Sequence, residues 1–73
     1  MKTLRNTKAG ETVGVRRIRV RGAFGRRLAD IGLTRGAMVT VIREAPFGDP
    51  MEISIMGCRF ALRKADAEMI EVE

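Results

Sequence analysis

The sequence predicts a mainly β fold, a small closed or nearly closed barrel of about five strands with one short helix after the first strand. Three observations support this prediction. The chain has 73 residues, about half of a typical domain, so we expect a single domain over residues 1–73. Short segments carry apolar residues at every second position, as half-buried strands do, and only one segment has apolar residues at helical spacing.

The first strand is expected over residues 12–20. Apolar residues occupy alternate positions up to Val15 and again from Ile18, but their parity changes at Arg16 and Arg17. A one-residue change of parity turns side chains to the other face of a strand. The pattern therefore predicts a bulge or bend at the two arginines.

A short helix is expected to follow from Gly22. Phe24, Leu28 and Ile31 stand at positions i, i+4 and i+7, which places them on one face of a helix. Gly32 comes next, where a glycine in the left-handed conformation commonly ends a helix. Residues 33–36 are then predicted to form the loop that returns the chain to the sheet.

A second strand is predicted over residues 38–43, which are rich in valine and isoleucine. It ends at residues 45–46 because the residue before a proline is kept out of the helical region. Residues 46–50 form a turn cluster. Met51, Ile53 and Ile55 then alternate with Glu52 and two further residues, which predicts a half-buried third strand with its apolar set inward.

The fourth strand is expected to pair with the third as a hairpin, with a turn at Gly57 and Cys58. It carries Phe60 and Leu62 at alternate positions. Residues 64–68 predict a single helical or 3₁₀ turn, and a last short strand follows over residues 70–72.

The residue inventory excludes most enzyme classes. The chain has no histidine, so the usual general base and the commonest metal ligand are missing, and no phosphate-binding GxxxxGK[ST] loop is present. The single cysteine, Cys58, is expected to be a buried or half-buried apolar residue rather than a nucleophile. Met51, Met56 and Cys58 fit strand packing better than a copper site. We therefore expect no enzymatic activity, no cofactor and no bound metal.

The same inventory suggests a cytoplasmic protein. No apolar run approaches the ~20 residues that span a bilayer, and the start of the chain lacks the apolar segment of a secretory signal. One cysteine cannot form an internal disulfide, in agreement with a reducing compartment. We expect cytoplasmic localisation without insertion into a membrane.

Charge is divided unevenly along the chain, whose net charge is +5. Residues 1–36 contain ten Lys or Arg and two Asp or Glu, a net +8, whereas residues 37–73 contain four and seven, a net −3. Because many of the arginines lie between Arg16 and Arg27, we expect a positive face that attracts an anionic partner. A solvated basic surface without a dedicated partner is the alternative.

Three kinds of partner could use such a face. Nucleic acid is disfavoured because the chain has no Trp or Tyr, and Phe24 and Phe60 are expected in the core rather than as stacking platforms. Proline-rich peptide is excluded because its recognition needs a groove lined with aromatic rings. A protein at the inner surface of a membrane, where anionic lipid also attracts Lys and Arg, remains.

Three segments in order along the chain resemble the ferrous iron transport protein A (FeoA) family of small SH3-like domains. They are RRLADIGLTRG at residues 26–36, APFGDP at residues 45–50 and ALRKADAEMIEV at residues 61–72. The resemblance covers nearly the whole length. One departure is Arg35, where the family usually has proline, so the loop there is expected to be less rigid.

The resemblance implies an accessory role in ferrous iron uptake through contact with the cytoplasmic, GTPase-bearing part of a FeoB-like membrane transporter. The domain would then lie at the inner face of the membrane through its partner and would act by binding. The alternative reading is a small basic barrel that binds RNA or the ribosome. Weak homo-oligomerisation stays open.

The expected partner-binding residues fall in the turn and in two basic pairs. In the turn, Pro46, Phe47, Gly48 and Asp49 form the best candidate contact, because prolines restrain a large apolar side chain at the tip. Phe47 alternatively folds back to close the end of the barrel. Asp49 either pairs with a cation of the partner or forms an Asx turn with its own backbone.

Arg26 and Arg27 are expected on the exposed side of the helix, as partner contacts or as solvated charges. One of them would be able to act in trans on the transporter's GTPase site, as arginine fingers do. Arg63 belongs to the same surface or caps the turn that follows it.

Overall fold

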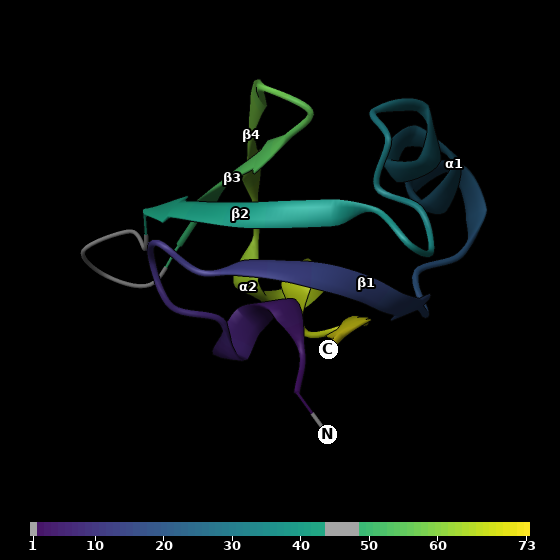
Figure 1. The fold of residues 1–73 in the computed structure, drawn as a ribbon. Coiled ribbons are helices and arrows are strands. Elements are labelled where there is room, and N and C mark those ends of the chain that lie inside the picture. Colours follow the sequence, from purple (N-terminus) through teal and green to yellow (C-terminus); the bar gives the residue numbers. More distant parts are fainter. Residues whose placement is uncertain (1, 44–48) are drawn as a thin grey trace.

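Five antiparallel strands form a single sheet in the computed structural model, which describes residues 2–43 and 49–73 (Figure 1). The strand order is β4-β3-β2-β1-β5, and the β3–β4 hairpin crosses behind β2 at a steep angle. The mainly β fold with a helix after the first strand is confirmed. The elements are η1 (Leu4–Asn6), β1 (Thr12–Ile18), α1 (Gly22–Asp30), β2 (Met38–Arg43), β3 (Met51–Ile55), β4 (Cys58–Leu62), α2 (Lys64–Ala67) and β5 (Ile70–Val72).

Strand β1 contains the predicted bulge. Its pairing with β5 shifts register between Val15 and Arg17, so two residues of β1 lie opposite one step of the partner strand. As a result Arg16 and Arg17, although consecutive, are both exposed. The strand ends at Ile18, two residues earlier than the sequence pattern predicts.

Helix α1 ends as the sequence predicts, at a glycine in the left-handed conformation. Gly32 has φ of +94° and its N–H donates to the carbonyl of Ala29 at 3.0 Å, while the N–H of Leu33 donates to the carbonyl of Leu28 at 2.9 Å. This pair of bonds is the Schellman arrangement that satisfies the last carbonyls of a helix. It turns the chain so that both leucine side chains enter the core.

The β3–β4 hairpin turns one residue earlier than predicted. Ile55 pairs with Cys58, so the two turn residues are Met56 and Gly57, with φ of +52° and +83°. Positive φ at both central positions defines a type I′ turn, which suits the twist of a hairpin. Cys58 is therefore a strand residue, and it is exposed. The expectation of a buried or half-buried cysteine is wrong.

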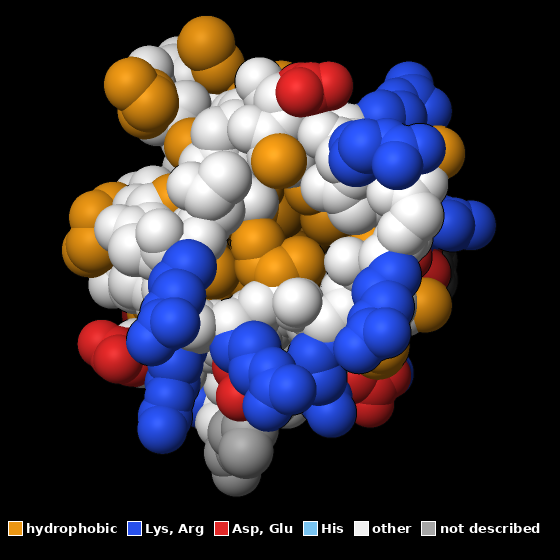
Figure 2. Space-filling model, turned by 90° about the vertical axis from the view of Figure 1, so that its right-hand side faces the viewer, with side chains coloured by type: hydrophobic (Ala, Val, Ile, Leu, Met, Phe, Trp, Pro, Cys, Tyr) orange, Lys and Arg blue, Asp and Glu red, His pale blue; other side chains and the backbone are white. Residues whose placement is uncertain are grey.

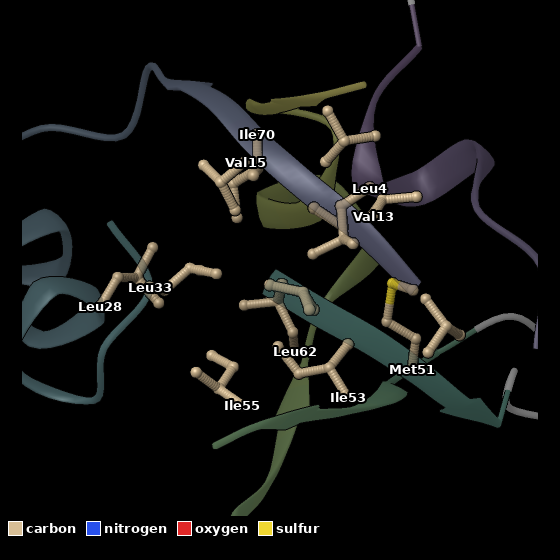
Figure 3. Close-up of a cluster of buried hydrophobic side chains, with 14 residues drawn as sticks. Leu4, Val13, Val15, Leu28, Leu33, Met51, Ile53, Ile55, Leu62 and Ile70 are labelled. Carbon is tan, nitrogen blue, oxygen red and sulfur yellow. The ribbon is translucent and has the colours of Figure 1, made fainter. Parts of the chain in front are cut away.

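The core lies between the sheet, α1 and the N-terminal segment (Figure 3). Leu28 and Leu33 approach it from the helix and the loop after it, and Leu4 enters from η1. Phe24 and Phe60, which the sequence assigns to the core, are only partly buried against its border. The strands contribute Val13, Val15, Val39, Val41, Met51, Ile53, Ile55, Leu62, Ile70 and Val72.

Within the described residues, neither helix has the length and apolar character that crossing a membrane would require.

Candidate functional site

The predicted turn is described only at its end. Pro46, Phe47 and Gly48 lie outside the described residues, whereas Asp49 is described and exposed. Its carboxylate Oδ1 accepts a hydrogen bond of 2.8 Å from the backbone N–H of Lys64, the first residue of α2. The first N–H groups of a helix have no acceptor within the helix, so this bond satisfies one of these donors. Asp49 thus makes a contact within the chain that neither of its expected roles includes.

Arg63 stands at the same helix end, in the position that precedes α2. Its Nε donates to Oδ2 of Asp66 at 2.9 Å. Arg63 occupies the N-cap position, but its side chain makes no capping hydrogen bond to the backbone of α2, so the expected capping role of this side chain is not seen. Asp49 and Arg63 are therefore brought together at the start of α2, while Arg26 and Arg27 lie on a different element, α1.

Arg26 and Arg27 are exposed, as expected, and Arg27 borders an apolar groove of about 250 Å³. One wall of the groove is α1, with Phe24, Leu28 and Ile31 at helical spacing. The other wall comes from the hairpin, with Ile53, Phe60, Ala61 and Leu62.

The groove exists because α1 buries only part of its apolar stripe. The stripe predicts a core-facing helix, yet Leu28 alone is buried, and Phe24 and Ile31 pack partly exposed against the border of the core. The groove is the space between this stripe and the edge strand β4. A partly exposed apolar groove beside a cation is suited to bind an apolar side chain of a partner.

A second, more polar hollow of about 410 Å³ lies on the other side of Phe60 and Ala61, which line both. It contains Glu52, whose carboxylate forms ion pairs with Arg43 at 3.9 Å and Arg59 at 3.6 Å. Asp49 and Pro50 also line it. The end of the predicted turn therefore lines a hollow that adjoins the apolar groove, since Phe60 and Ala61 line both.

No group of three His, Cys, Asp or Glu side chains that could hold a metal occurs among residues 2–43 and 49–73. Most of the carboxylates form ion pairs with basic side chains, as Glu52 does. The apolar groove with Arg27 at its border has a geometry suited to recognition of an apolar side chain.

The sequence reasoning named Arg26 and Arg27 but missed the groove that one of them borders. Its two walls come from segments separated by more than twenty residues, so no local pattern shows that they face each other. The sequence feature that could have indicated the groove is the stripe of Phe24, Leu28 and Ile31, on a helix that also contains glycine and two arginines.

Comparisons with known proteins agree on one family. The model of the FeoA domain matches residues 2–73. A fusion protein of Fe(2+) transport protein A and the Fe(2+) transporter FeoB from Porphyromonas gingivalis is 38% identical over 64 residues, which is 88% of this chain. The match spans only 8% of that relative's length.

Solved structures give the same result. The solution structure of the FeoA protein from Chlorobium tepidum is similar with a TM-score of 0.93 and 40% identity, covering 99% of this chain and 69% of that one. The crystal structure of FeoA from Stenotrophomonas maltophilia, complexed with zinc and described as a prokaryotic SH3 domain protein, has a TM-score of 0.82 and 26% identity. It covers 100% of this chain and 91% of that one. The barrel is thus of the SH3-like type.

Proposed function

The chain belongs to the FeoA family of ferrous iron transport, and from that membership we propose that it binds the cytoplasmic part of a FeoB-like membrane transporter and modulates it. It would do so in the cytoplasm, at the inner face of the membrane, without a cofactor and without chemistry of its own. The apolar groove between α1 and the β3–β4 hairpin is the proposed contact surface.

The observation that carries this proposal is the fusion in the relative from Porphyromonas gingivalis, which joins a domain like this one to the transporter in a single polypeptide. A covalent link raises the effective concentration of two partners to about the millimolar range. Where the two are separate chains, they need a contact surface with affinity of its own. The groove offers apolar area with a basic border for this purpose.

The groove indicates what the partner should provide. Its walls at Phe24, Ile31 and Phe60 are partly exposed and would bury apolar area on docking. Arg27, which lines the groove, and Arg26, next to it on α1, would pair with carboxylates. We expect the partner to present a segment with one or two apolar side chains flanked by acidic residues.

The predicted turn is proposed as the second half of the contact. Asp49 and Pro50 line the hollow next to the groove, with Phe60 between the two. Pro46, Phe47 and Gly48 precede them in the chain, and Phe47 stays the proposed anchor. Arg63, at the start of α2 beside the residue that Asp49 contacts, is the remaining candidate.

The alternative of RNA binding has less support. Proteins that bind single-stranded nucleic acid stack bases on exposed aromatic rings. The described aromatic residues, Phe24 and Phe60, instead pack against the core.

The test is a binding measurement between the purified chain and the cytoplasmic domain of the FeoB-like transporter, without lipid. Ile31→Lys places a long, charged side chain at a half-buried position that lines the groove and should weaken binding at least tenfold. The matched control is Ile42→Lys, the same change at a half-buried isoleucine that does not line the groove.

Phe47→Ala tests the turn in the same assay. If Ile31→Lys binds with wild-type affinity, the groove is not the contact surface. If the wild-type chain does not bind at all, the proposed function itself is wrong. The transporter's GTP turnover, measured with the wild-type chain and with the Arg26→Ala/Arg27→Ala variant, tests modulation. Equal turnover with both would exclude an arginine acting in trans.

A further inference from the structure

Three arginines line a broad hollow at the end of β1, away from the walls of the apolar groove. Arg16, Arg17 and Arg35 border this hollow of about 570 Å³ together with Ile18 and Glu71. All three arginines are exposed. Within the part of the chain that the structure describes, none of them forms an ion pair. By contrast, each of five other arginines is paired with an acid: Arg5, Arg19, Arg43, Arg59 and Arg63.

The backbone builds this arginine cluster. In an unbroken strand, consecutive side chains point to opposite faces, so one of Arg16 and Arg17 would face the core. The bulge between Val15 and Arg17 exposes both. Arg35 joins them from the loop before β2, which is held to β1 by a 2.8 Å hydrogen bond from the N–H of Gly36 to the carbonyl of Val15.

The one acid that lines the hollow is already neutralised. Glu71 is buried, and its carboxylate lies 3.3 Å from Nε of Arg19. The charge of Arg16, Arg17 and Arg35 is therefore not offset by a neighbour that lines the hollow with them. Figure 2 shows a face of the molecule on which Lys and Arg side chains lie to the left of, below and to the right of an apolar centre.

We infer that the arginine cluster binds the headgroups of anionic phospholipids and thereby orients the domain on the membrane surface. Guanidinium groups bind phosphate oxygens in a bidentate manner, and an anionic leaflet offers many phosphates in one plane. Several exposed arginines on a broad face match such a plane. The inference rests on the proposed function, which places the domain beside a bilayer.

Nucleic acid, the other common polyphosphate, fits this face less well. The residues that line the hollow include one aliphatic side chain, Ile18, and no aromatic ring on which a base could stack. The binding is peripheral, since it depends on surface charge, and it should therefore fall steeply as salt is raised.

The experiment is sedimentation of the chain with vesicles of phosphatidylcholine alone and with vesicles that contain about one third phosphatidylglycerol, an anionic lipid, at low and at physiological salt. The wild-type chain should bind only the anionic vesicles. Replacement of Arg16, Arg17 and Arg35 by Gln should lower the partition coefficient roughly 100-fold, because each arginine near an anionic surface contributes about a fivefold gain.

The matched control replaces Arg5, Arg43 and Arg59 by Gln, which removes the same net charge from exposed arginines elsewhere. It should keep most of the binding to anionic vesicles. Equal loss in both variants would show an effect of net charge only and would overturn the inference, as would absence of binding by the wild-type chain. Tighter binding of single-stranded RNA than of vesicles, lost in the Arg16, Arg17 and Arg35 variant, would also overturn it.

Measurement of the same variants against the lipid-free transporter domain separates the two proposals. The Arg16, Arg17 and Arg35 variant should bind that domain as the wild type does, whereas Ile31→Lys should bind that domain poorly and still bind vesicles. If vesicles bind and the transporter domain does not, the proposed function fails while the lipid site stands.

Discussion

The carboxylate of Asp49 accepts a hydrogen bond from the backbone N–H of Lys64, 2.8 Å away and 15 residues further along the chain. This hydrogen bond links the segment just before β3 to the first residue of α2. It also satisfies a backbone amide that has no partner within the helix. A side chain that lies outside the helix in sequence thus does the work of a helix cap.

Asp49→Ala should therefore lower the free energy of unfolding by about 1 kcal/mol, as loss of a helix cap does. Urea unfolding followed by circular dichroism measures the change. Asp30→Ala is the control, since it removes the same charge from an exposed side chain of α1. Equal stability of the two variants would mean that the bond to Lys64 contributes nothing.

Gly25 stands inside α1, where replacement of glycine by alanine ordinarily stabilises a helix by about 1 kcal/mol. Here the sign should reverse. A β carbon at Gly25 would lie 2.6 Å from the carbonyl oxygen of Val20, so the helix and the segment before it would have to separate. We expect Gly25→Ala to cost about 1–3 kcal/mol.

Thermal unfolding would show that loss as a clear fall in Tm. The control is Gly14→Ala, whose β carbon would meet only the sulfur of Met38 at an ordinary 3.6 Å. A Gly25→Ala variant with unchanged or higher Tm would contradict the close approach of α1 to Val20.

Met56 occupies the first central position of the hairpin turn with φ of +52°, a conformation that asparagine and glycine adopt at lower cost. Its side chain is 91% exposed and so contributes little packing. Met56→Asn should raise the free energy of unfolding by about 0.5–1 kcal/mol, and Tm by a few degrees. Met56→Ala keeps the strain and should leave Tm nearly unchanged. A lower Tm for Met56→Asn would argue against the type I′ turn.

Glu11 ties down the N-terminal segment and carries a pH dependence. A hydrogen bond of 2.8 Å from the Lys8 backbone N–H and a second of 2.9 Å from Lys2 Nζ lower the pKa of the Glu11 carboxyl below its ordinary value. A depressed pKa in the folded chain stabilises it above the unfolded pKa, and this stabilisation disappears as pH falls through the folded value.

The stability difference between the wild-type chain and Glu11→Gln should therefore be present at neutral pH and vanish in acid, below the ordinary pKa of a glutamate. Urea midpoints across this range measure it, with Glu73→Gln as a control of equal charge. A difference that grows in acid would contradict the assigned direction. NMR titration of the Glu11 carboxyl would give the pKa directly.

Local features of the fold could be predicted from the sequence because they depend on neighbouring residues. The parity change between Val15 and Ile18 indicates the bulge, and Gly32 marks the end of the helix. Cys58 shows where such reasoning fails. It lies opposite Ile55 on the inner face of the hairpin, yet it is exposed, because burial at a hairpin tip depends on which other elements cover it.

The candidate site was predictable only in part, because it depends on which elements of the fold come together. The exposed positions of Arg26 and Arg27 follow from the helical stripe on their own element. The groove between Phe24 and Ala61 depends on the distance at which α1 stands from β4. The contact between Asp49 and Lys64 depends on the path of the chain between them. The pattern of apolar and polar residues does not indicate that path.

The two ends of the described chain run side by side. The N–H of Val72 donates to the carbonyl of Lys2 at 3.0 Å, and Thr3 bridges to Glu71, so both ends lie below β1 in Figure 1, while the β3–β4 hairpin extends above β2. A polypeptide continued from either end would leave the domain at this lower pole. Such a linker would not cover the groove between α1 and the β3–β4 hairpin, which would remain accessible to a partner.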